Sequence, residues 1–202
     1  MDRKKLIFGG LVAVIVLSVT GADLLLQAHQ FRGSVIDPPF PAPDLKLQDQ
    51  NGQTFQLSAQ RGKIVLMFFG YTNCPDVCPT TLAQFRQVGA ELGPQASQVR
   101  FVFVTVDPER DTAEKMKAYL DAIDPAIVGL VGPQTELEPI WKSYGVYRQK
   151  QPGQSPGDYA DALEHSSRVY LVDAQGDLRL TYSFGLVPDD VVQDIKYLLR
   201  KG

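Results

Sequence analysis

The pattern of apolar and polar positions divides the chain into an apolar N-terminal run and a longer part in which strand and helix patterns alternate. Residues 6–22 carry no charge and are mostly apolar, and Leu24–Leu26 continue the run beyond Asp23. About 17–25 such residues cross a bilayer as a helix. The run is apolar on every face, unlike a helix that covers one side of a soluble core. The pattern therefore predicts one N-terminal transmembrane helix within residues 1–26.

Positive charge at the N-terminus predicts how this segment is oriented. Arg3, Lys4 and Lys5 precede the apolar run, and basic residues stay on the cytoplasmic side of a membrane. We therefore expect an inner-membrane, single-pass protein with its C-terminal domain in the periplasm. Residues 20–22 offer the small side chains of a signal-peptidase site, so a cleaved signal peptide is the alternative. The leucines that extend the run past this point favour the uncleaved anchor.

Prolines dominate the segment that follows the predicted anchor. Pro38, Pro39, Pro41 and Pro43 stand close together, and proline-rich segments adopt extended conformations. This composition predicts an extended linker over residues 27–40. The chain would then consist of an anchor at 1–26, this linker, and a folded domain at 41–202.

Within the predicted domain, strand patterns occur in five places. A hairpin is expected around Asn51-Gly52, because both residues tolerate the positive φ of a tight turn. A continuous apolar run at 63–70 is typical of a central strand, and β-branched runs follow at 99–107 and 126–132. Two strands joined by a turn at 174–177 predict a second hairpin near the C-terminus.

Helix patterns separate these strands. They begin after Pro79, at Asp111 as an N-cap, at Thr135 as an N-cap, and at Pro188. The order of elements is βαβα(β)α followed by ββα, which predicts an α/β fold with a mixed sheet and helices on both faces. This is a thioredoxin-like layout.

Composition narrows the classes of partner. The 202 residues have a formal net charge of -3, with 44% hydrophobic and 21% charged residues. These values describe an ordinary folded protein and lack the basic excess of a phosphate-backbone binder. Nucleic acid is therefore not an expected partner.

Cys74 and Cys78 are the only cysteines, and they lie between a predicted strand and the helix after it. The start of a helix favours thiolates, so we expect activated sulfur. A disulfide across so small a loop would add little stability, which argues against a structural role. Thioredoxin-type exchangers use Cys-x-x-Cys, but the wider spacing here does not exclude exchange. Two thiolates can also hold Cu(I), and an added imidazole would accommodate Cu(II). Redox exchange and copper binding both stay open.

One histidine is a candidate for that third ligand. His165 lies just before a predicted strand and ends a loop rich in Gln, Gly and Pro. Such a loop can carry the ring toward the cysteines or away from them. An isolated histidine is usually a surface or hydrogen-bonding residue, so its position in the sequence alone does not place it beside the thiols.

Four segments together resemble the Sco/SenC family of membrane-anchored copper proteins: "FGYTNCPDVCP", "VTVDPERDT", "YGVYRQK" and "DYADALEHSSRVYLVD". The resemblance covers about residues 40–200, and its first two motifs are specific in combination. It implies a thioredoxin-like domain in which Cys74, Cys78 and His165 bind one copper ion. The family commonly has Asp immediately before this histidine, whereas Glu164 stands there in this chain.

The resemblance also implies a function. A member of this family would be a metallochaperone that carries Cu(I) or Cu(II) to the copper A centre of cytochrome c oxidase. Its partners would be the copper-binding subunit of the oxidase and, further, other copper chaperones or thiol oxidoreductases. The main alternative is an enzyme, a thiol-disulfide oxidoreductase that keeps the acceptor's cysteines reduced through Cys74 and Cys78. A copper-responsive sensory module is a third class.

Asp107 is a further candidate site residue. It ends a predicted strand beside the expected site, where a carboxylate could orient a metal ligand. The same segment, "DPERDT", equally suits a strand exit, a proline turn and a helix cap.

Overall fold

The computed structural model describes residues 29–150, 163–165 and 167–201. The chain divides into two compact units, residues 1–30 and residues 31–202. The predicted anchor at residues 1–26 lies outside the described residues. Within the described ranges, no helix is both long and apolar enough to cross a bilayer.

An eight-stranded mixed sheet forms the centre of the second unit, in the order β1-β10-β9-β4-β5-β6-β2-β3. Strands β4, β5 and β6 are parallel to one another, and the other neighbours pair antiparallel. Strands β7 and β8 make a separate two-stranded ribbon. The strands are β1 Ser34–Pro41, β2 Lys46–Asp49, β3 Thr54–Gln56, β4 Ile64–Gly70, β5 Val99–Thr105, β6 Val128–Val131, β7 Arg148–Lys150, β8 Leu163–His165, β9 Val169–Val172 and β10 Asp177–Tyr182.

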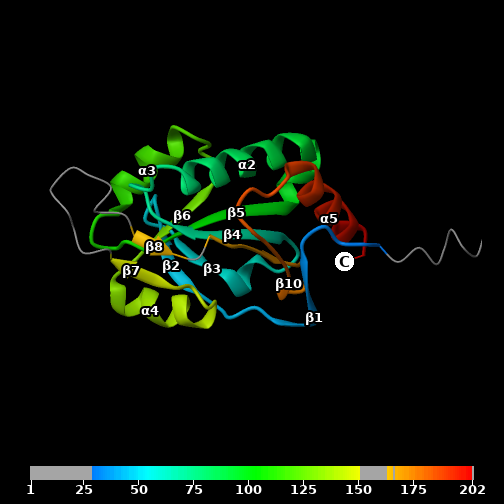
Figure 1. Cartoon of the computed structure of the whole chain (residues 1–202), viewed down its shortest axis with the longest axis horizontal. Coiled ribbons are helices and arrows are strands. Elements are labelled where there is room, and N and C mark those ends of the chain that lie inside the picture. The colour runs from blue at the N-terminus through cyan, green and yellow to red at the C-terminus, as the bar shows by residue number, and fades with distance from the viewer. Residues whose placement is uncertain (1–28, 151–162, 166, 202) are drawn as a thin grey trace, which may run out of the picture. The chain divides into compact units, whose positions relative to one another are not determined.

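Helices cover both faces of this sheet, as the sequence predicts. Helices α2, α3 and α5 lie on one side of the sheet and α4 lies on the other (Figure 1). The two hairpins and the central strands also match the predicted pattern. The helices are α2 Val77–Leu92, α3 Ala113–Asp121, α4 Gln134–Ser143 and α5 Pro188–Lys201, with 3-10 turns η1 Leu57–Gln60 and η2 Gly93–Gln98.

Strand β4 supplies side chains to the cores on both sides of the sheet. All of its residues are buried, and successive side chains of a strand point to opposite faces. The Phe68 ring stacks on Phe103 at 6.0 Å, and Phe103 in turn lies against Tyr119 of α3. The Phe69 ring instead packs on Tyr144 at 5.3 Å, at the end of α4. The end of β4 is therefore fixed from both sides.

The predicted linker at residues 27–40 is wrong over most of its length. Its second half is extended, but it is the edge strand β1, which pairs with β10. The register shifts between Val35 and Phe40, and an irregular edge strand tolerates prolines that a central strand would not. Before the strand, the backbone N–H groups of Arg32 and Gly33 donate to the buried carboxylate of Asp194 on α5 at 3.0–3.1 Å. The folded unit therefore begins at residue 31.

Candidate functional site

The two cysteines lie on the segment that joins β4 to α2. Cys74 is partly exposed in the loop, and Cys78 is fully buried as the second residue of α2. No disulfide joins the two sulfurs. The backbone N–H of Cys78 donates to Sγ of Cys74 at 3.3 Å. Because the N–H groups at a helix start stabilise negative charge, this contact favours a thiolate at Cys74.

The structure corrects the expectation that both sulfurs are activated. Burial raises the pKa of the Cys78 thiol well above its usual value, and the hydrogen bond with the Cys74 side chain and the charge of Cys74 act in the same direction. The position at the start of α2 does not compensate, because the sulfur points into the core against Gly70 rather than toward solvent. The pair therefore consists of one accessible sulfur and one buried sulfur that holds its proton.

Asp111 ties the cysteine loop to β5. Its carboxylate accepts the Thr72 hydroxyl at 2.6 Å, the Thr72 backbone N–H at 3.2 Å and the Thr105 hydroxyl at 2.7 Å. Burial raises the pKa of Asp111, although these hydrogen bonds oppose the shift. The predicted N-cap role of Asp111 is wrong. Thr112 caps α3 instead, accepting the Lys115 N–H at 3.2 Å.

Asp107, the candidate from the sequence, is also close to the start of this loop. Its side chain is buried and forms an ion pair with Arg110 through Oδ2. The Arg110 guanidinium lies 5.8 Å from the centre of the Tyr71 ring. The other oxygen, Oδ1, is buried and accepts no hydrogen bond from the part of the chain that the structure describes. Asp107 thus reaches the cysteine loop through Arg110, and its role toward a ligand stays a prediction.

The backbone of His165 belongs to the β7–β8 ribbon, where it pairs with Arg148. Its side chain lies outside the described part of the structure. The Arg148 guanidinium stacks over the Trp141 ring at 5.0 Å, and Trp141 Nε1 donates to the carbonyl of Thr105 at 3.1 Å. Thr105 is the register partner of Gly70, where the cysteine loop begins. This series of contacts connects the His165 backbone with the strand end at which the cysteine loop begins.

The described side chains alone do not form a complete metal site. Among them, no group of three His, Cys, Asp or Glu residues is placed to hold a metal ion. The described part of the site is therefore the pair of sulfurs from Cys74 and Cys78.

Comparison with known proteins assigns the family. The family model described as SCO1/SenC matches residues 37–200. The chain belongs to the SCO1/SenC family. A SCO2-like protein of Rickettsia felis is 32% identical over 153 residues, which cover 76% of this chain and 74% of that protein.

Solved structures of Sco proteins share the fold. ScoI of Bradyrhizobium japonicum, solved with copper bound, has a TM-score of 0.72 at 38% identity and covers 79% of this chain and 100% of its own. The solution structure of apo Sco1 from Thermus thermophilus has a TM-score of 0.75 at 36% identity, covering 86% of this chain and 99% of its own. The chain therefore has the thioredoxin-like Sco fold, and the resemblance in the sequence is confirmed.

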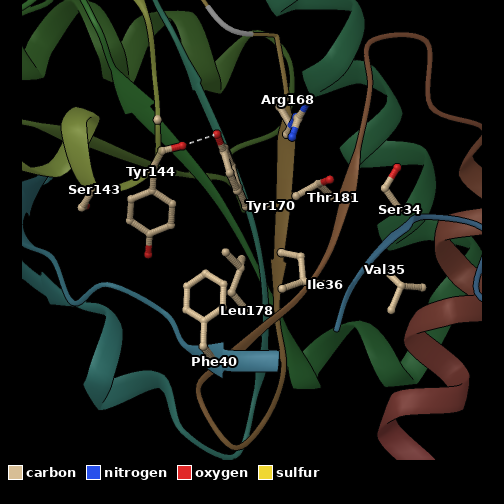
Figure 2. Close-up of a pocket in the computed structure, with 11 residues that line it drawn as sticks. Ser34, Val35, Ile36, Phe40, Ser143, Tyr144, Arg168, Tyr170, Leu178 and Thr181 are labelled. Carbon is tan, nitrogen blue, oxygen red and sulfur yellow. Dashed lines mark hydrogen bonds between the residues drawn. The ribbon is translucent and has the colours of Figure 1, made fainter. Parts of the chain in front are cut away.

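A separate cavity of about 570 Å³ lies away from the thiols of this Sco domain. Its wall comes from β1, the end of α4, and strands β9 and β10, and none of the described cysteine-loop side chains lines it. Figure 2 shows Ile36, Phe40 and Leu178 around its apolar part, with the Tyr170 hydroxyl donating to the carbonyl of Tyr144. The cavity is therefore not part of the thiol site.

Proposed function

We propose that the chain is a copper metallochaperone that carries Cu(I) or Cu(II) on Cys74, Cys78 and His165 and delivers it to the copper A centre of cytochrome c oxidase. Residues 1–26 would anchor it in the inner membrane with the domain in the periplasm. The proposal is supported by membership of the SCO1/SenC family and by the bound copper of the similar ScoI. The observation that carries it is the contact between the Cys78 N–H and the Cys74 sulfur, which brings two soft donors together at the end of the sheet that the His165 backbone approaches.

The difference in burial gives the two sulfurs different parts in copper transfer. Cys74 is accessible and stabilised as a thiolate, so it meets the incoming ion first. Cys78 then ligates only after its sulfur has lost the proton that burial retains. On release, an acceptor's thiolates displace His165 and Cys74 before the buried Cys78, so copper passes between proteins without becoming free.

A thiol-disulfide oxidoreductase is the second candidate, because an exposed and a buried cysteine also suit exchange. The Cys74 thiolate would attack an acceptor disulfide, releasing one acceptor thiolate and leaving a mixed disulfide. The Cys78 thiolate would then attack Sγ of Cys74 and release the second acceptor thiolate, so that two protein thiols reduce one disulfide. The raised pKa of Cys78 opposes this second step and copper ligation alike, so the two functions are separated by copper-free turnover and not by the pKa.

The test uses the full chain in detergent micelles, reduced and without oxygen. Parent, Cys74→Ser, Cys78→Ser and His165→Ala are titrated with Cu(I) and Cu(II), and stoichiometry and sulfur-to-copper absorption are recorded. The parent should bind about one copper per chain, both serine variants should lose the absorption band, and His165→Ala should lose Cu(II) affinity preferentially. Unchanged Cu(II) binding and unchanged oxidase loading by His165→Ala would show the three-ligand model to be wrong. Copper-free turnover of disulfides by the same variant would favour the reductase.

A further inference from the structure

We propose that Arg148 is a positioning residue for His165, which rests on the proposed function because it assumes that His165 is a copper ligand. The stack of Arg148 on Trp141 would hold the β7–β8 ribbon at the cysteine end of the sheet. Without that stack the third ligand position would be poorly held, although both thiols would stay in place.

The strand register links the two residues directly. Arg148 and His165 are directly opposite each other in the antiparallel pair β7–β8. The Cα atoms of directly opposite residues in such a pair lie about 4.5–5.5 Å apart. Whatever fixes the backbone at residue 148 therefore fixes the backbone at residue 165.

The ribbon needs an anchor outside itself. It has three residues in each strand and is not part of the eight-stranded sheet. A lone two-stranded ribbon is at best marginally stable in water, so its position depends on contacts with the rest of the domain. The contact between Arg148 and Trp141 at 5.0 Å is one such contact on the ribbon itself.

Trp141 is a rigid platform for this contact. It is 5% exposed, and its Nε1 donates to the carbonyl of Thr105 at 3.1 Å. Thr105 pairs with Gly70 at the carboxyl ends of β5 and β4, and the cysteine loop leaves the sheet at Gly70. A shift of the indole would therefore disturb the strand ends beside the thiols, whereas a shift of the ribbon alone would not.

Among the described residues, the contact that the structure gives for the Arg148 guanidinium is the stack on Trp141. Its Nε and Nη2 atoms are buried, and neither donates a hydrogen bond to any residue in the described ranges. The planar guanidinium can lie flat on an aromatic ring, which a lysine ammonium cannot do. Removing Arg148 should therefore release the ribbon without leaving a buried carboxylate unpaired among the described residues.

The first test measures the ribbon in the copper-free, reduced full chain. Amide hydrogen exchange in Arg148→Ala should become at least ~10-fold faster in β7 and β8 while the amides of β4 and β5 keep the parent rate. Arg200→Ala, which removes an exposed arginine at the end of α5, is the matched control and should leave the ribbon unchanged. Unchanged ribbon exchange in Arg148→Ala would overturn the proposal.

The second test measures copper. Arg148→Ala should weaken Cu(II) binding ~10-fold or more and move the sulfur-to-copper band toward that of His165→Ala, while Cu(I) affinity changes by less than ~3-fold. Arg148→Lys keeps a charge near the indole but not the flat stack, so its Cu(II) affinity should lie between those of the parent and Arg148→Ala. It also guards against a fold defect, because it preserves the length of the side chain. A lysine variant that binds Cu(II) as tightly as the parent would contradict the stacking account, because the positive charge alone would then be sufficient.

A double-mutant cycle separates positioning from general damage. If Arg148 acts through His165, then Arg148→Ala should cause no further loss of Cu(II) affinity in a His165→Ala background. Additive losses would overturn this inference and leave the three-ligand model standing. An unchanged Cu(II) affinity in His165→Ala alone would overturn both.

Discussion

The sulfur of Cys78 lies 2.7 Å from the point that a β-carbon on Gly70 would occupy. The Phe103 ring is equally close to that point, at 2.6 Å. Real β-carbons do not approach other atoms so closely, and neither a helix-bound thiol nor a buried ring can move away easily. The space for the buried sulfur therefore depends on the missing side chain at the end of β4.

Replacing Gly70 by alanine should accordingly destabilise the reduced, copper-free protein by about 1–3 kcal/mol, because it overpacks the site. Urea denaturation measures the change. Gly89→Ala is the control. Gly89 lies within α2, and a β-carbon there would be in ordinary van der Waals contact with the Phe101 ring at 3.4 Å. That variant should be neutral or stabilised by up to ~1 kcal/mol through helix propensity. Equal stabilities for the two variants would mean that Cys78 is not packed against Gly70.

The two thiols should react at different rates. In the reduced full chain at neutral pH, iodoacetamide should modify Cys74 at least ~10-fold faster than Cys78, because only Cys74 is accessible and stabilised as a thiolate. Peptide mass spectrometry at timed intervals gives the two rates. In urea the rates should become similar, which controls for local sequence. Similar rates in the folded protein would contradict the assigned burial.

Copper loading should release protons and tighten with pH. Burial keeps the pKa of Cys78 raised, so its thiol is protonated at neutral pH and must become a thiolate to bind the ion. Each proton released makes the apparent affinity rise ~10-fold per pH unit, and we expect this slope between about pH 6 and 8. Calorimetry in buffers of different ionisation enthalpy counts the protons. The Cys78→Ser variant should release one proton fewer than the parent on binding copper. An apparent copper affinity that does not change with pH would be inconsistent with a protonated Cys78.

Asp194 should matter more for stability than any exposed acid of the same helix. It is buried and accepts the Tyr182 hydroxyl at 2.9 Å as well as the N–H groups of Arg32 and Gly33. Asp194→Ala leaves these donors without their acceptor and should cost about 2–4 kcal/mol in urea denaturation. Proteolysis near residue 31 should become faster at the same time.

The matched control for this change is Asp189→Ala. Asp189 is exposed in the first turn of α5, so its loss removes only a favourable charge at the helix start, worth about 0.3–1 kcal/mol. Copper binding should be the same in both variants. If Asp194→Ala and Asp189→Ala lower the free energy of unfolding by the same amount, the buried carboxylate of Asp194 does not hold the start of β1.

The sequence predicts those parts of the fold that depend on a repeating pattern. The continuous apolar run of β4, the hairpin turn at Asn51-Gly52 and the period of α2 are local signals, and the structure confirms them. Strand β1 was not predicted, because its prolines are typical of a linker. The pairing with β10 shows that these prolines stand on an irregular edge strand.

The site is less predictable, because its properties depend on contacts between distant segments. Two neighbouring residues, Asp111 and Thr112, could each have capped α3, and the choice depends on Thr72, which binds the aspartate. The position of Cys78 at a helix start suggests an acidic thiol, but the packing against Gly70 and Phe103 reverses that expectation. No local pattern could connect Arg148 with Trp141 or His165.

The attachment of Arg32 and Gly33 to Asp194 also sets how far the domain could travel. Four residues, 27–30, separate the end of the predicted span at Leu26 from the folded unit that starts at Phe31. Fully stretched, this tether reaches no more than ~18 Å between the Cα atoms of residues 26 and 31. With the proposed anchor in place, the domain would search a thin layer at the membrane surface, where a membrane-embedded acceptor is met at high local concentration and a freely diffusing one is not.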